Sequence, residues 1–172
     1  MDNSIKDKSK NQILDAALKV FVQKGYVSTT MDDIVNESGL SKGAIYHHYD
    51  SKNHLFLNLI DHWETYFFTD IFKKNIVNTN PDILLREIVK DIVYAFKHKK
   101  YIFLAELEFW SLANHDEKVR KRTKILYVKL LKLLKDIILM GVENHKYKKL
   151  NVDVAALSIM TAFQGVIWFS IF

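Results

Sequence analysis

The sequence predicts an all-α protein, and three observations support that prediction. Only five glycines and one proline occur among 172 residues, so few positions interrupt a helix. Apolar residues recur every three or four positions along most of the chain, as they do on one face of a helix. The alternating β-branched runs that are typical of strands are few. Because apolar residues make up 49% of the chain, a sizeable core can form and disorder is not expected.

Four helices are expected in the first part of the chain, and each has a recognisable boundary. Glycine is suited to the residue after a helix, so Gly25 and Gly39 are expected to end the first and second helices. Short polar side chains cap the beginnings: Thr30 with Asp33 for the second helix, Ser41 for the third and Ser51 for the fourth. The expected ranges are 9–24, 31–38, 42–48 and 52 to about 75.

The second part of the chain begins after the linker Asn78–Pro81, in which Asn80 can cap a helix and Pro81 can occupy its first position. Four further helices are expected, near residues 82–98, 101–113, 117–143 and 151–172.

Several classes of protein and site are disfavoured by the composition. The chain has no cysteine, which excludes disulfides and thiolate metal sites and suits a reducing cytoplasm, the location we expect. The polar N-terminus lacks the apolar segment of a secretory signal. The seven histidines show no metal-ligand spacing, and no phosphate loop or nucleophile motif occurs. We therefore expect no metal, no cofactor and no enzymatic activity.

The net charge of +5 is unevenly distributed. Residues 1–52 carry seven basic and seven acidic side chains, whereas residues 96–149 carry fourteen basic and six acidic ones. Any nucleic-acid site in the first part of the chain must therefore depend on local arrangement rather than on overall charge.

The helices expected at 31–38 and 42–48 are joined by Ser38–Ser41 and have the shape of a helix-turn-helix. At about 100° per residue, Ile45 and Tyr49 fall on the inward side of the second of these helices. Gly43 and His47 face outward. Small and polar residues on an outward face allow a helix to approach the major groove of DNA.

The segment TTMDDIVNESGLSKGAIYHHYDSKNHLFLNLI, residues 29–60, closely resembles the DNA-binding signature of the tetracycline-repressor (TetR) family. That signature is a helix-turn-helix, then Lys-Gly, a recognition Tyr, an aromatic-His-aromatic run and Ser-Lys. Val35 replaces a frequent Ala and Tyr49 a frequent Phe, and both keep the apolar role. The resemblance implies a helix-turn-helix DNA-binding domain at residues 1–51 and a helical effector-binding and dimerisation domain at 52–172.

The resemblance also implies a function and a set of contacts. The expected protein is a homodimeric regulator, usually a repressor, that binds a palindromic DNA operator and is released by a small apolar or amphipathic effector. An alternative is an architectural or cell-division DNA-binding factor on the same scaffold without an effector. By matching position, the expected phosphate contacts are Thr30, Ser41, Lys42, Tyr46, His48 and Lys52, and the base-reading face is Gly43, Ala44, Tyr46 and His47.

The run FLAELEFW, residues 103–110, places Glu106 and Glu108 among large apolar side chains. Two interpretations stay open: the aromatic residues of the second domain line an effector cavity, or they form a solid core while the acids face water. The residues expected to line a cavity are Trp63, Phe67, Phe96, Phe103, Glu106, Phe109, Trp110 and Phe163.

The last 19 residues, Val154–Phe172, carry no charge. A membrane span is one interpretation, but the polar Ser158, Thr161 and Gln164 favour a core or dimer helix, in which small residues permit close packing. Family members usually continue for one more helix, so this chain is expected to be truncated or to lack that helix. The basic run 118–138 suits a solvated helix face better than a membrane surface.

Overall fold

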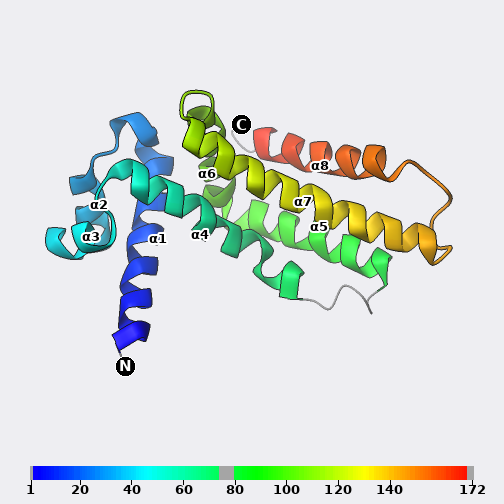
Figure 1. Ribbon diagram of the computed structural model, residues 1–172, viewed down its shortest axis with the longest axis horizontal. Coiled ribbons are helices and arrows are strands. Elements are labelled where there is room, and N and C mark those ends of the chain that lie inside the picture. The colour runs from blue at the N-terminus through cyan, green and yellow to red at the C-terminus, as the bar shows by residue number, and fades with distance from the viewer. Residues whose placement is uncertain (1, 74–79, 170–172) are drawn as a thin grey trace. The chain divides into compact units, whose positions relative to one another are not determined.

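The computed structural model describes residues 2–73 and 80–169, and this part of the chain contains eight helices and no strand (Figure 1). The all-α prediction is therefore confirmed. The helices are α1 (Asp2–Ser28), α2 (Met31–Ser38), α3 (Lys42–His48), α4 (Lys52–Lys73), α5 (Pro81–His98), α6 (Lys100–Ala113), α7 (Glu117–Glu143) and α8 (Val152–Phe169).

Most predicted helix boundaries agree with the structure. The expected start of the first helix at residue 9 is wrong, because α1 begins at Asp2. The expected break at Gly25 is confirmed: its φ of 74° and ψ of 160° are not helical, and α1 continues beyond it only as a short turn. Asn80 caps α5 by accepting from the Asp82 N–H, with Pro81 at the start of the helix. The expected end of the fourth helix near residue 75 lies outside the described residues.

The chain divides into two compact units, and each draws on two separate stretches. The first unit comprises Met1–Tyr66 and Ala105–Thr123, and the second comprises Phe67–Leu104 and Lys124–Phe172. The predicted boundary between residues 51 and 52 separates functions, whereas this division reflects packing alone. The functional boundary therefore stays a prediction.

The core of the first unit is built around aromatic rings. Phe56 of α4 makes edge contacts with Phe21 and Tyr26 of α1, at 5.0 and 4.8 Å between ring centroids. It also contacts Phe109 of α6 at 5.5 Å. These contacts fix the start of α4 and the end of α1 against one another. In the same unit, Ile34 of α2 and Ile45 of α3 are fully buried.

The second unit buries one face of α5 and α7 at helical spacing. On α5 the buried residues are Leu84, Ile88 and Ile92, and on α7 they are Leu126, Leu133, Leu134, Ile137 and Ile138. Lys135 of α7 forms an ion pair with Asp153 of α8 at 2.5 Å. Across residues 2–73 and 80–169, no helix is long and apolar enough to span a membrane.

Candidate nucleic-acid interface

The turn between α2 and α3 is held by local hydrogen bonds. Gly39 adopts the left-handed region with a φ of 67°, which glycine accommodates without strain, and its N–H donates to the Val35 carbonyl. From α1, the Gln12 side chain donates to the Ser38 carbonyl at 2.8 Å. The sharp reversal between the two helices is thus fixed both from within and from α1.

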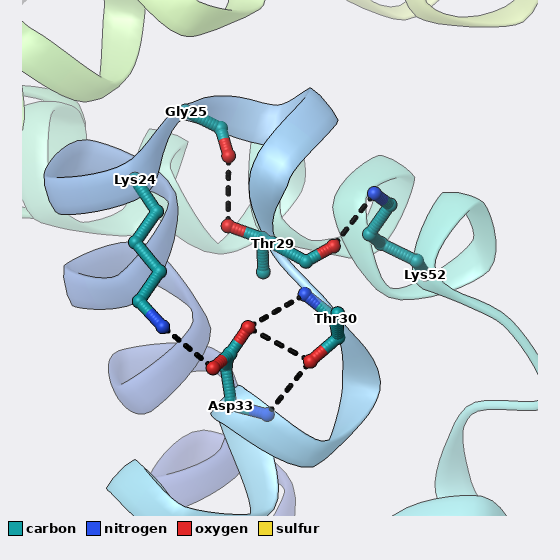
Figure 2. Close-up of polar contacts among 6 residues, drawn as sticks. All are labelled: Lys24, Gly25, Thr29, Thr30, Asp33 and Lys52. Atoms are coloured by element: carbon teal, nitrogen blue, oxygen red, sulfur yellow. Dashed lines mark hydrogen bonds and ion pairs between the residues drawn. The ribbon is translucent and has the colours of Figure 1, made fainter.

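The beginning of α2 carries the predicted capping pair, in its reciprocal form (Figure 2). Thr30 Oγ1 accepts from the Asp33 N–H, while the Asp33 carboxylate accepts from the Thr30 N–H and hydroxyl. Lys24 of α1 pairs with the same carboxylate at 2.6 Å. The hydrogen bond from Lys24, followed by those from Thr30, lowers the pKa of Asp33 to about 2. Asp33 therefore stays ionised, and its charge is opposed by that of Lys24.

Helix α3 presents the inward face that the sequence predicts. Its N-cap Ser41 accepts from the Ala44 N–H at 3.2 Å. Ile45 and Tyr49 are buried, at 0% and 1% exposure. Burial raises the pKa of Tyr49 to about 12, and the hydroxyl has no hydrogen-bond partner among the described residues. These two side chains fix the rotation of α3 about its own axis.

The opposite face of α3 is open to solvent. Gly43 and His47 are exposed, and Tyr46 keeps 43% of its surface. Lys42 pairs with Asp32 of α2 at 2.7 Å, and its ammonium lies 5.9 Å from the centre of the Tyr46 ring. The hydrogen bond with Asp32 raises the pKa of Lys42. The open face therefore consists of Gly43 and the rings of Tyr46 and His47. Beside it lies Lys42, whose ammonium is ion-paired with Asp32.

Lys52, at the start of α4, has partners that the sequence did not indicate. Its ammonium donates to the carbonyl oxygens of Tyr26 and Thr29 at 2.7 Å each, and lies 3.3 Å from the Val27 carbonyl (Figure 2 draws the contact with Thr29). A lysine ammonium has three N–H donors, and all three of these acceptors are backbone groups. The phosphate contact expected of Lys52 stays a prediction, and the structure directs its ammonium inward.

The residues predicted to line an effector cavity are distributed over both units. In the first unit, Trp63 and Phe109 are buried with ring centroids 5.8 Å apart, and Trp110 Nε1 donates to the buried Glu106 at 3.3 Å. The structure therefore brings four of the predicted residues into two contacting pairs.

In the second unit, Phe96 and the buried Phe103 have ring centroids 6.1 Å apart, and Phe163 is half-buried. The side chain of Phe67 lies outside the described residues. The predicted residues of this unit include one contacting pair, and their role in a cavity stays a prediction.

Two polar contacts of the first unit could not be foreseen from the sequence. Glu108 of α6 accepts from the backbone N–H of Tyr26 at 3.0 Å, and Asn53 of α4 donates to Asp116 at 2.8 Å. The partners are 82 and 63 residues apart. A local pattern contains no information on such pairs, so only the packing of the unit reveals them.

The helix-turn-helix region is similar to a known family of proteins. Residues 13–59, which include the whole helix-turn-helix, match the model of the bacterial regulatory proteins of the tetR family. This DNA-binding segment belongs to the TetR family.

Curated HTH-type relatives include the negative transcriptional regulator IcaR of the biofilm operon icaADBC from Staphylococcus epidermidis. It is 31% identical over 83 residues, which are 48% of this chain and 45% of IcaR. The activator FasR of Mycolicibacterium smegmatis is 25% identical over 161 residues, covering 91% of this chain and 72% of FasR. The chain spans less than half the length of the first curated relatives that it matches.

The fold of the whole chain also resembles solved TetR structures. A TetR transcription regulator from Haloarcula marismortui superposes with a TM-score of 0.86 at 21% identity, covering 96% of this chain and 87% of that one. At this identity the likeness concerns the fold alone. The relatives and the fold are those of transcription regulators and not of enzymes.

Proposed function

We propose that the protein is a cytoplasmic TetR-type repressor that binds a palindromic operator as a homodimer and is released by a small apolar or amphipathic molecule. The observation that supports DNA binding best is the open face of α3, where Gly43, Tyr46 and His47 are exposed on a helix whose rotation two buried residues fix. A helix so presented can enter a major groove about 12 Å wide.

Within this proposal the contacts divide by chemistry. His47, with Gly43, Ala44 and the Tyr46 ring, reads base edges, because these residues form the outward face of α3. The phosphate contacts come from Thr30, Ser41, Lys42, the Tyr46 hydroxyl and His48, whose side chains are exposed or half-exposed. Lys42 exchanges Asp32 for a phosphate on binding, since both side chains are exposed and paired only across the surface.

The homodimer is supported by an apolar surface of the second unit. The exposed apolar residues of its last two helices are Ile125, Val128 and Leu139 on α7 and Val154, Leu157, Val166, Trp168 and Phe169 on α8. Val154 keeps 60% and Trp168 58% of its surface, an unusual degree of exposure for so many large side chains on two neighbouring helices. Pairing of two copies buries such a surface in a symmetric interface. Light scattering at several concentrations should give twice the mass of one chain, and a concentration-independent monomer would contradict the proposal.

The effector is supported by the aromatic residues near α6 and by Glu106, a buried carboxylate that receives the Trp110 N–H. A buried acid among aromatic rings can select a cation or a hydroxyl donor. Mass spectrometry of the purified protein, native and then denatured, should reveal a retained organic molecule that lowers operator affinity when added back. A protein that retains no such molecule, and whose DNA binding no candidate alters, would favour the architectural alternative.

The decisive test of the DNA-binding proposal is the sequence preference of His47→Ala. The operator is the duplex that the wild-type protein selects from a random library. The variant should lose about 1–3 kcal/mol on the operator and much less on random duplex, because a base contact is lost while the phosphate contacts remain. His115→Ala, also on an exposed histidine of the same unit, is the matched control and should bind both duplexes normally. Equal losses on both duplexes would mean that His47 contacts the backbone instead.

A further inference from the structure

The peptide groups on either side of Tyr26, in the last turn of α1, are held by two side chains of opposite charge. The Tyr26 N–H donates to Glu108 Oε2 of α6 at 3.0 Å. The Tyr26 carbonyl accepts from Lys52 Nζ of α4 at 2.7 Å. The two contacts come from separate helices, and they meet at the residue that follows the break in α1.

Lys52 satisfies carbonyl groups at the end of α1. The last carbonyls of a helix lack partners within the helix, and they carry the negative end of its dipole. The ammonium also makes a cation–π contact with the Tyr26 ring, whose centre lies 4.5 Å away. Burial lowers the pKa of Lys52, which agrees with a side chain drawn into the protein rather than extended into solvent.

The contact from Glu108 depends on the break at Gly25. A Cβ added at Gly25 would lie 3.8 Å from Glu108 Oε2, so the carboxylate sits directly against the backbone at this point. The positive φ of Gly25 turns the chain away from helical geometry just before Tyr26. Glu108 therefore holds the chain at the one place in α1 where its direction changes.

The held segment leads directly into α2. The buried Thr29 hydroxyl donates back to the Gly25 carbonyl at 2.7 Å, and Lys52 holds the Thr29 carbonyl (Figure 2). The next residue, Thr30, is the N-cap of α2. Its backbone position is thus set by the contacts on residues 25–29.

We propose that Lys52 and Glu108 are positioning residues for DNA binding, which hold the junction at residues 25–30 so that the beginning of α2 meets the phosphate backbone. Lys52 then supports the interface from inside and contributes no phosphate contact of its own. Glu108, on a helix outside the helix-turn-helix, sets DNA affinity without touching DNA. This inference rests on the proposed function.

The test compares four variants with the wild-type protein on the duplex that the wild type selects from a random library. Glu108→Ala and Lys52→Met should each lower operator affinity by about tenfold, because loss of a hydrogen bond to a charged group reduces the population in which the junction is held in the binding-competent position. Glu108→Gln and Lys52→Arg keep an acceptor or donors and should recover most of the affinity. Hydrogen exchange of the Tyr26 amide should be faster in Glu108→Ala than in wild type.

The salt dependence separates a positioning role from a phosphate contact. Loss of a phosphate contact reduces the slope of log affinity against log salt by about one per half-site, whereas Lys52→Met should leave the slope at the wild-type value. Glu117→Ala, at an exposed acid of α7 in the same unit, should change neither affinity nor slope. Urea unfolding of each variant shows that the fold is retained.

Two outcomes would overturn the inference: operator affinity unchanged in Glu108→Ala with a faster Tyr26 amide, or a slope reduced by about one in Lys52→Met. A wild-type protein that selects no sequence at all would instead refute the proposed function, so the two failures are distinguishable.

Discussion

The substitution Gly43→Ala should stabilise the protein and weaken DNA binding at the same time. Gly43 lies in α3 with helical geometry, and a Cβ built on it meets no atom within 4 Å. The methyl group therefore enters open space. Replacing a helical glycine by alanine stabilises by about 0.5–1 kcal/mol, because alanine loses less backbone entropy on folding. The gain should raise the melting temperature by about 1–4 °C for a chain of this size.

On DNA the sign reverses, because the same open space is the proposed base-reading face. A methyl group forced into a close-packed interface costs about 1–3 kcal/mol, so operator affinity should fall roughly 5- to 150-fold. Random duplex, on which the helix need not approach the bases so closely, should be affected less. Urea unfolding gives the first quantity, and binding isotherms on the selected operator and a random duplex give the second.

Gly39→Ala is the matched control, because it adds the same methyl group in the same helix-turn-helix, again into open space. Gly39 has a φ of 67°, which costs an L-residue about 1–2 kcal/mol, so this variant should lose stability instead of gaining it. An operator affinity unchanged by Gly43→Ala would show that the outward face of α3 does not approach the bases.

Two further predictions concern stability. Tyr49→Phe should stabilise by about 1 kcal/mol, since it removes a buried hydroxyl without a partner. Because the pKa of Tyr49 is raised to about 12 from an ordinary value near 10, the wild type should lose stability as pH rises from 10 to 12, and urea unfolding should show less of this loss in the variant. Gly141→Ala should cost about 1–3 kcal/mol in the same assay, because the new Cβ would overlap the Tyr147 ring; an unchanged midpoint would contradict that packing.

The boundaries of the helix-turn-helix could be predicted because they depend on residues only a few positions apart. Thr30 and Asp33 satisfy each other's backbone groups, and Gly39 supplies the turn conformation that no other residue adopts as readily. The inward rotation of α3 likewise follows from the spacing of Ile45 and Tyr49. Interactions between residues so close in the chain can be predicted from the sequence alone.

Longer-range features could not be predicted in this way. The early start of α1 is one case: residues 2–8 lack apolar periodicity, but a helix that has already nucleated extends at little cost. The partners of Lys52 are a second case. Its position at the start of a helix predicted a contact with a phosphate, whereas in the fold its ammonium donates to backbone carbonyls. The choice between those partners depends on how α1 and α4 pack.

The division of the chain at Tyr66, Ala105 and Thr123 has a consequence for protein engineering. The compact unit that contains the helix-turn-helix includes stretches of α4, α6 and α7, so a fragment ending at residue 51 would leave its core without Phe56 and Phe109. A chimera with the operator preference of another regulator should therefore exchange two stretches together, the first 66 residues and residues 105–123. A graft of the first stretch alone would keep the contact of Lys52 with Tyr26 but would replace Glu108 by a residue of the host regulator. Such a chimera should keep the operator preference of the grafted stretch and bind the operator less tightly.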